Sequence, residues 1–272
     1  MAGPRPLHLA KEAATLRVAG KVHVGLDVDV KDLRVVIPSL GRPDTIGETL
    51  ALFPPEVVTV CVSQEEAEAY QATCPGVTVL AHPGLRGLGR TRQWILDTMS
   101  ESVIFMIDDD LPGCWAVAGN RIRRLRDPHQ ILGIVRQAAR CAAEAGTPLF
   151  GFAFNADPRN FKAQSPFAMN GFVTGAMGFV GRDPRLQFDV AQRTKAEIDY
   201  SLQVLLYYRF LWKDTRYSFS ASGEFQNSGG NSAFRTLDTV REDILRLKRR
   251  WGAMIDTTSE RRNRGGRGKK KS

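Results

Sequence analysis

Three consecutive carboxylates, Asp108, Asp109 and Asp110, directly follow the apolar run Val103–Ile107. Such a run predicts a strand covered on both faces, and ligands of open α/β sheets bind outside the carboxyl ends of the strands. Adjacent carboxylates repel one another, so the cluster favours a hard divalent cation with oxygen ligands. A solvated turn is the alternative, but it does not need so apolar a strand before it. We therefore predict a metal site at this strand end.

The strand before the carboxylates is one of several short apolar strands in the first half of the chain. Segments of helical pattern separate them, and Asp44 or Thr45 is a suitable N-cap for the first helix. This alternation predicts a right-handed parallel α/β layer with helices on both faces. The expected strands are Leu33–Ile37, Val57–Val62, Val77–Leu80 and Val103–Ile107, and the expected helices are Gln64–Gln71 and Arg90–Met99.

The second half of the chain is less regular. The glycines within Phe161–Phe188 indicate tight hairpins or backbone that lies close to a ligand. Residues 1–32 are weakly patterned and are expected to form an N-terminal extension, with a short helix near His8–Val18. Further helices are expected at Pro128–Glu144, Lys195–Phe210 and Thr239–Trp251, with a strand at Pro148–Phe154.

The composition describes a globular protein with an anionic partner. Its 43% of hydrophobic residues supply a sizeable core, and no apolar stretch reaches the roughly 18 residues that would cross a membrane. The start of the chain lacks the apolar core of a signal peptide, so we expect an intracellular protein with no membrane partner.

The formal charge of +9 favours an anionic partner. The four cysteines form no CxxC pair and are expected to be free thiols.

Basic residues gather at three places along the sequence. The tail at 256–272 has seven basic residues, and no acidic or apolar residue, between Arg261 and Lys271, which predicts a disordered arm. Each cluster could follow a nucleic-acid backbone. The alternatives are a solubilising terminus for the tail and a solvated helix face for the internal clusters. The internal clusters contain Arg123 and Arg124, and Lys248, Arg249 and Arg250.

Several short motifs follow one another along the chain in a defined order. A strand ends in Pro38-Ser39-x-Gly41-Arg42, a glycine-rich loop leads into Arg90-Thr91-Arg92, the acidic strand end follows, and Glu197-Ile198-Asp199 opens a late helix. In this order the sequence resembles nucleotide-sugar glycosyltransferases of the GT-A type, most of all the glycosyltransferases associated with TET-type dioxygenases in phage DNA hypermodification. The resemblance covers Leu33–Trp251. It implies a GT-A-like catalytic domain at 33–255, with a Rossmann-like, mixed but mostly parallel sheet flanked by helices.

The resemblance implies a UDP-type nucleotide-sugar donor and a manganese or magnesium ion. Asp108 and Asp110 take the two acidic positions of a DxD motif, Asp110 as the better metal ligand and Asp108 nearer the ribose of the nucleotide. Residues two apart on a strand share a face, so Asp109 is expected to point elsewhere. Arg92 is expected to hold the nucleotide or pair with the acids. Its alternative is an exposed helix arginine such as Arg90.

Two loops complete the donor site implied by the resemblance. Pro38, Ser39 and Arg42 line the nucleotide-base pocket, with a plain turn as the alternative. Many such enzymes have a histidine metal ligand beyond the late helix, but all four histidines of this chain precede it. Carboxylates, phosphates and water, or a substitute residue, would complete the metal shell. Gly229 and Gly230 are placed to approach the diphosphate through their backbone N–H groups, unless they form a surface turn.

Transfer to an alcohol needs a base for the hydroxyl proton. Inverting members of the group use a carboxylate at the start of a late helix, in a pattern like Glu-Asp-x-Asp. This chain departs from that pattern, so both Glu197 and Asp199 stay candidates for the base. Acidic residues in the first turn also complement the helix dipole without any catalytic role.

The resemblance implies an acceptor of 5-hydroxymethylcytosine in DNA, flipped out or single-stranded so that it reaches the donor. Trp115 or Phe161 could stack on the base, or either could be a core residue. The implied location is the cytoplasm, that of the host cell if a phage encodes the protein. Two alternatives stay open: a GT-A enzyme acting on a protein, lipid or small glycan, and a non-catalytic nucleic-acid-binding protein on the same scaffold.

Overall fold

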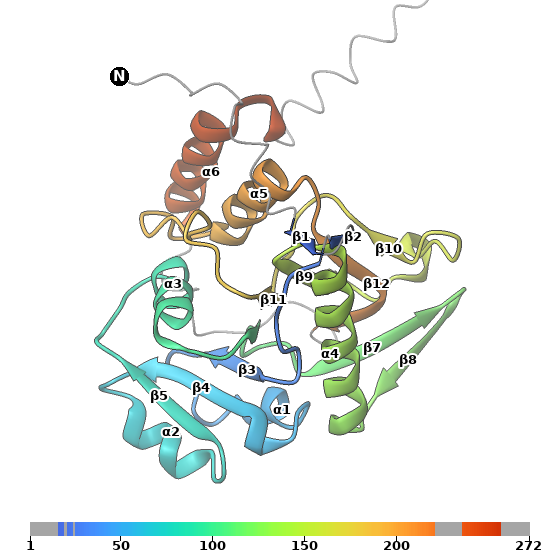
Figure 1. The fold of residues 1–272 in the computed structure, drawn as a ribbon. Helices are drawn as coiled ribbons and strands as arrows, with labels where there is room; N and C mark the ends of the chain where they lie inside the picture. The colour runs from blue at the N-terminus through green and yellow to red at the C-terminus, as the bar shows by residue number, and fades with distance from the viewer. Residues whose placement is uncertain (1–15, 19–20, 24, 221–235, 257–272) are drawn as a thin grey trace, which may run out of the picture.

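One mixed sheet organises the chain, of which this computed structural model describes residues 16–18, 21–23, 25–220 and 236–256 (Figure 1). The strand order is β5-β4-β3-β6-β11-β9-β12-β7-β8, with β10 paired to β12. β3, β4, β5 and β6 are mutually parallel, β9 and β12 run in the same direction, and β11 and β7 run in the opposite one. The predicted α/β class with a mixed, mostly parallel sheet is confirmed.

The first half of the chain follows the predicted strand and helix alternation. The predicted cap does not form, because the residue before α1 is Ile46 and makes no side-chain capping bond. The elements are β1 (Leu16–Val18), β2 (Lys21–His23), β3 (Leu33–Pro38), α1 (Gly47–Leu50), a 3₁₀ turn (Pro55–Val57), β4 (Val58–Ser63), α2 (Ala67–Thr73), β5 (Thr78–His82), α3 (Leu88–Thr98) and β6 (Val103–Ile107). The prediction of a helix near His8–Val18 is wrong for Leu16–Val18, which form β1 and pair with β2. The rest of the predicted helix lies outside the described residues.

The second half departs from the predictions in its strands. The predicted helices form, but β7, β8 and β12 have no counterpart in the sequence-based assignment. The elements are β7 (Gly113–Ala118), β8 (Arg121–Leu125), α4 (Pro128–Ala145), β9 (Leu149–Ala153), a 3₁₀ turn (Pro158–Asn160), β10 (Phe167–Ala168), β11 (Ala176–Val180), α5 (Ala196–Tyr208), β12 (Trp212–Ser220), α6 (Leu237–Trp251) and a 3₁₀ turn (Gly252–Met254). β7 and β8 form a hairpin that projects from the end of the sheet (Figure 1).

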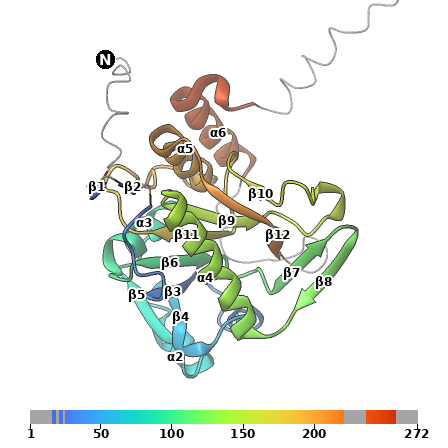
Figure 2. The same cartoon turned by 45° about the vertical axis from the view of Figure 1, so that its right-hand side comes forward.

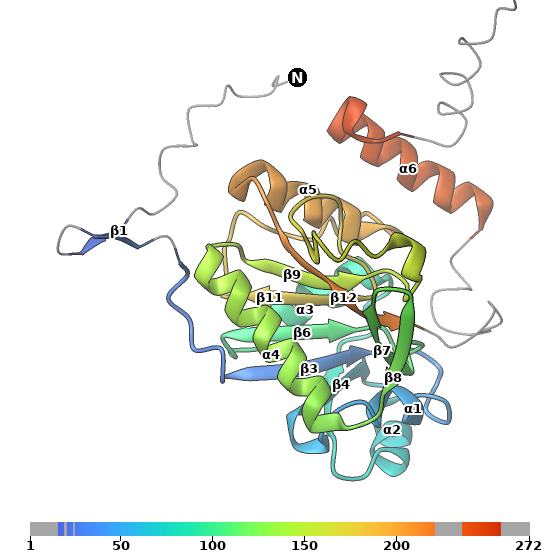
Figure 3. The ribbon, with the colours of Figure 1, turned by 90° about the vertical axis from the view of Figure 1, so that its right-hand side faces the viewer.

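Helices cover both faces of the sheet, as the alternating pattern predicts. Side chains of α1, α2 and α4 join one apolar cluster with strand residues such as Val35 and Phe105, and α3 and α5 join the other with Val36 and Ile104. α4 lies across its face in Figures 2 and 3. Every residue of β6 is buried, because this strand lies in mid-sheet between the two clusters.

An aromatic stack sets the packing of the central strands. The rings of Phe105 on β6 and Phe150 on β9 stack with centroids 6.0 Å apart, across Gly178 of the intervening β11. A Cβ at Gly178 would lie 1.9 Å from the Phe150 ring. This glycine therefore makes room for a ring. Ring packing is a reason for glycine in this segment that the sequence pattern did not indicate, in addition to tight hairpins and close approach to a ligand.

No helix in the described part of the chain is long and apolar enough to span a bilayer. The four cysteines are all free, as predicted. Cys61, Cys74 and Cys114 are buried, and burial raises the pKa of Cys61 and of Cys114 to about 12. Cys141 is only partly buried.

This difference in burial predicts selective thiol chemistry. In the native protein only Cys141 should react promptly with iodoacetamide, because a reactive thiol must be accessible and ionised. Intact-mass spectrometry should find one adduct on the native protein and four after denaturation. Rapid native labelling of Cys61 or Cys114 would contradict the packing described here.

Candidate functional site

The site lies where the carboxyl ends of β3 and β6 meet the start of β11. The Asp108 N–H donates to the Gly175 carbonyl at 2.8 Å, which joins the end of β6 to the loop before β11. Gly175 has a φ of +71°, and a Cβ there would lie 3.0 Å from Leu111 and 3.7 Å from Asp108 Oδ2. Only glycine allows this close approach without strain.

Arg92 of α3 is the centre of the site. Its side chain is 2% exposed, its Nη2 lies 2.6 Å from Asp108 Oδ1, and its Nη1 lies 3.6 Å from Glu197 Oε2. The alternative of an exposed helix arginine is therefore wrong. Burial raises the pKa of Asp108 to about 6 against the opposing effect of Arg92, and Asp110, Glu197 and Asp109 raise it further. One buried cation thus joins two carboxylates that are 89 residues apart in sequence.

A pocket opens beside this ion pair. It is lined by Leu88 and Arg92 of α3, Asp108, Thr174, and residues 193–197 at the start of α5. The Thr174 hydroxyl donates to Glu197 Oε1 at 3.4 Å. The Glu197 side chain is 17% exposed and faces Arg92. Sequence reasoning missed Thr174 and residues 193–195, because nothing in their local pattern signals a pocket.

Asp109 lies outside the pocket lining, in the turn after β6, where it and Asp110 both contact Arg42. Its carboxylate accepts from Ser39 Oγ at 2.6 Å and pairs with Arg42 Nη1 at 2.6 Å. Burial raises its pKa, against the opposing effects of Ser39 and Arg42. Tyr70 of α2 supports the same loop, with its hydroxyl 2.7 Å from Ser39 Oγ and accepting from the Arg42 N–H. Asp109 thus fixes the loop after Pro38 that was predicted to line a base pocket.

Asp110 is the most open of the three carboxylates, with a side chain 39% exposed and 3.5 Å from Arg42 Nη1. Asp108 Oδ2 accepts no hydrogen bond from any described residue, while Oδ1 is committed to Arg92. In the described part of the chain no three His, Cys, Asp or Glu side chains are grouped as metal ligands. Asp108 and Asp110 offer carboxylate oxygens, the ligands that hard divalent cations prefer, and a cation held by these two residues would complete its shell from ligand phosphates or water.

The two candidate bases lie on different sides of α5. Glu197 faces the pocket, whereas Asp199 is buried against α6. The Asp199 carboxylate accepts from Trp251 Nε1 at 2.7 Å, from Gln203 Nε2 at 2.7 Å and from Arg250 Nη1 at 2.9 Å. Successive residues of a helix are turned by about 100°, so residues two apart face nearly opposite ways. Only Glu197 reaches Arg92.

The predicted nucleic-acid residues form two separate groups. Arg123 and Arg124 lie on the exposed strand β8, so the expectation of a helix face there is wrong. Arg124 lies over the Trp115 ring at 5.7 Å. Lys248, Arg249 and Arg250 lie on α6, as predicted, beside α5 and far from the hairpin (Figures 1 and 3). Phe161 is partly buried after the 3₁₀ turn that ends at Asn160.

Gly229 and Gly230 lie outside the described residues, as does the predicted disordered tail from residue 257 onward. The extension and tail boundaries at 32 and 256 therefore stay predictions.

A model of the family described as TET-Associated Glycosyltransferase matches residues 33–217. The chain belongs to this family. The resemblance drawn from the order of its motifs is confirmed, and the mixed, mostly parallel sheet agrees with the predicted GT-A-like fold class. Among curated proteins, none matches this sequence significantly.

Two solved structures illustrate its structural relatives. Glucosyl-3-phosphoglycerate synthase from Mycobacterium tuberculosis, in complex with Mn²⁺, UDP and phosphoglyceric acid, has a TM-score of 0.49 and 15% identity over 83% of this chain and 80% of that one. TarS 1–349 from S. aureus, in complex with UDP-GlcNAc, has a TM-score of 0.47 and 12% identity over 79% of this chain. The match spans 66% of that TarS fragment, just under two thirds of its length.

The position of Asp199 predicts a structural effect for its substitution. Asp199→Asn should lower the free energy of unfolding by about 1–3 kcal/mol, because it weakens buried hydrogen bonds to charged and polar partners on α6. Urea denaturation followed by circular dichroism measures the change. Asp44→Asn, at an exposed aspartate with no described partner, is the control and should be neutral. Equal stability of the two variants would contradict this role.

Proposed function

We propose that this protein is a metal-dependent glycosyltransferase that moves a sugar from a UDP-type nucleotide-sugar onto the hydroxyl of 5-hydroxymethylcytosine, or another 5-hydroxymethylpyrimidine, in DNA. Membership of the family supports the class of reaction. The observation that carries the proposal is the single pocket in which Glu197 lies beside Arg92 and Asp108. Glu197, the proposed proton acceptor, is therefore held close to Asp108, a carboxylate proposed to bind the nucleotide-sugar.

The donor end of the site must stabilise the diphosphate that leaves. Asp110 and the free oxygen of Asp108 are the residues that would hold Mn²⁺ or Mg²⁺, which when bound neutralises charge on the diphosphate. Arg92 fixes the orientation of Asp108 through the 2.6 Å contact. The loop of Pro38, Ser39 and Arg42, tied to Asp109, is the proposed wall of the nucleotide pocket.

Glu197 is the proposed base. Its carboxylate accepts the proton of the hydroxymethyl group as the oxygen of that group attacks the anomeric carbon of the sugar. Thr174 and Arg92 hold the carboxylate from two sides, which leaves its direction fixed. Attack from the face opposite the departing diphosphate is a single displacement, so the proposed reaction inverts the anomeric configuration.

The DNA acceptor is supported by charge and by family membership. The basic residues proposed to contact phosphates are Arg123 and Arg124 on β8, and Lys248, Arg249 and Arg250 on α6. Arg250 also pairs with Asp199, so its guanidinium is partly engaged within the protein. The target base must be flipped out or single-stranded, because its hydroxymethyl group has to enter the pocket.

The decisive experiment uses DNA containing 5-hydroxymethylcytosine, a panel of nucleotide-sugars and Mn²⁺, followed by digestion to nucleosides and mass spectrometry. We expect a nucleoside heavier by one sugar residue with one donor. Asp110→Ala should abolish that product while DNA binding, measured by electrophoretic mobility shift, persists. Unchanged nucleoside mass with every donor would exclude this acceptor. Absence of nucleotide-sugar binding as well would point to a non-catalytic DNA-binding protein.

A second prediction separates the two acidic residues of α5. Glu197→Gln should lower kcat by roughly 10²- to 10⁴-fold, because it removes the proton acceptor but keeps the shape of the side chain. Asp199→Asn is the matched control, because Asp199 lies two residues further along the same helix and faces away from the pocket. This variant should retain kcat. Steady-state rates with saturating donor provide the measurement. Near wild-type turnover by Glu197→Gln would remove Glu197 from the mechanism.

A further inference from the structure

Residues 192–195 form a short segment between the pocket and α6. Thr194 and Lys195 line the pocket, and Lys195 is the N-cap residue of α5. Lys195 has a φ of +60° and a ψ of 22°, the left-handed conformation that residues other than glycine rarely adopt. A non-glycine residue held in this region marks a backbone that its surroundings constrain.

Lys195 is a cationic residue among those that line the pocket. Its side chain makes no ion pair or hydrogen bond with any residue in the described ranges, whereas neighbouring Arg193 pairs with Glu242 and Asp243. Arg92 also lines the pocket, and its buried Nε and Nη1 donate no hydrogen bond, although Nη1 lies 3.6 Å from Glu197 Oε2. Ala196 and Glu197, at the positive end of the α5 dipole, line the same pocket. Such a set of donors is complementary to an anion.

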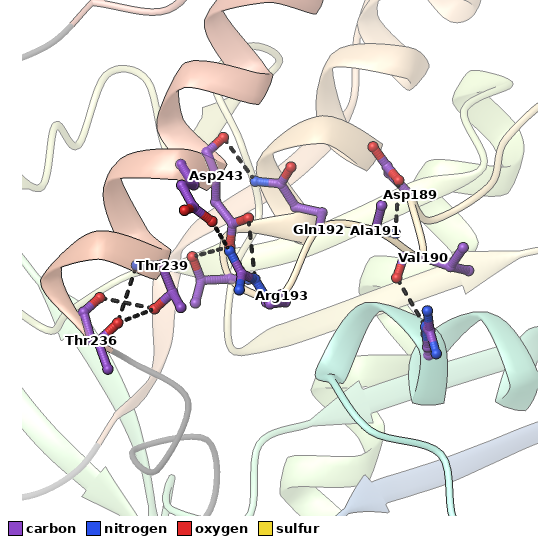
Figure 4. A network of polar contacts seen from close by, with 11 residues as sticks. Asp189, Val190, Ala191, Gln192, Arg193, Thr236, Thr239 and Asp243 are labelled. Atoms are coloured by element: carbon purple, nitrogen blue, oxygen red, sulfur yellow. Dashed lines mark hydrogen bonds and ion pairs between the residues drawn. The ribbon is translucent and has the colours of Figure 1, made fainter.

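Asp243 of α6 makes hydrogen bonds to residues of the segment 192–195, and Figure 4 shows the polar network around it. The side chain of Asp243 is 2% exposed, and its Oδ2 accepts from the Thr194 N–H at 2.7 Å and from Thr194 Oγ1 at 2.9 Å. The main-chain carbonyl of Asp243 accepts from Gln192 Nε2 at 3.1 Å. α6 lies beyond the residues matched by the family model. The residues on both sides of Arg193 are thus bonded to α6, Gln192 through its side-chain amide and Thr194 through its backbone N–H and its hydroxyl.

We infer that Lys195 binds the diphosphate of the nucleotide-sugar donor, and that Asp243 is the positioning residue that sets it in place through Thr194. This inference rests on the proposed function and names the residues of this chain that meet its leaving group. As the bond between the anomeric carbon and the phosphate oxygen breaks, the electron pair stays on that oxygen. The acceptor oxygen bonds to the carbon and its proton passes to Glu197. The Lys195 ammonium donates to the diphosphate that is released.

The unusual φ provides a clean test. Lys195→Gly removes the ammonium while it relieves the backbone, so the variant should be at least as stable as the wild type. Arg209→Gly is the matched control, at the other left-handed residue of α5, φ +73°, at the opposite end of the helix. Calorimetric titration with UDP and UMP in the presence of Mn²⁺ should show roughly 10- to 100-fold weaker UDP binding by Lys195→Gly, the range for losing a hydrogen bond to a charged group. UMP binding should change much less, and Arg209→Gly should match the wild type.

The role of Asp243 is tested against a substitution that loosens α6 elsewhere. Asp243→Asn and Asp199→Asn both weaken a tie between α6 and the rest of the chain, but only Asp243 contacts Thr194. We expect a severalfold higher Kd for UDP in Asp243→Asn and an unchanged one in Asp199→Asn. Equal effects of the two variants would reduce Asp243 to a structural residue and overturn its part of the inference.

The outcomes separate this inference from the proposed function. Wild-type UDP affinity in Lys195→Gly would overturn the assignment of Lys195 and leave the donor proposal in place. Failure of the wild-type protein to bind UDP would overturn the UDP-type donor and this inference together.

Discussion

The buried guanidinium of Arg92 is the contact on which the site depends. A buried charge is strongly unfavourable unless paired, and Arg92 meets this requirement with Asp108 from β6 and Glu197 from α5. α3, β6 and α5 are thus held around one cation, although they come from distant parts of the chain. Without it, the carboxylates proposed to serve the donor and the acceptor would repel one another across the pocket. This pairing leaves Nε of Arg92 without a hydrogen-bond acceptor, and Nη1 has only its 3.6 Å contact with Glu197 Oε2.

The central strands bring these groups together by packing. β11 runs between β6 and β9, and Gly178 lets the rings of Phe105 and Phe150 stack across it. This arrangement places the loop before β11 against the end of β6, where Gly175 adopts a positive φ beside Asp108. The glycines of this region therefore act in two ways, one by admitting a ring and the other by bringing backbone to the site.

Carboxylates divide into those that open to the pocket and those that hold the scaffold. Asp109 ties the loop of Ser39 and Arg42 to the strand end, and Asp199 and Asp243 tie α5 and the segment before it to α6. Asp108 and Glu197 line the pocket, and Asp110 is the most exposed of the three strand-end carboxylates. α6 lies outside the residues matched by the family model, yet it contributes to two of the three scaffold ties. The walls of the pocket therefore depend on an element beyond the matched region.

The sequence alone determined the strand and helix alternation of the first half, the position of three acidic residues at a strand end, and the family. Those features are local, because an apolar run followed by Asp108, Asp109 and Asp110 carries its own pattern. The environments of the three carboxylates were decided by tertiary contacts, since Asp108 pairs with Arg92 whereas Asp109 and Asp110 both contact Arg42. Tertiary structure alone decided that Glu197 and not Asp199 meets Arg92, that the basic run at Arg121–Leu125 is a strand, and that Lys195 faces the pocket. Each of these depends on pairing between segments far apart in the chain. β8 becomes a strand by pairing with β7, and Lys195 takes its conformation where Asp243 holds Thr194, contacts that no local pattern encodes.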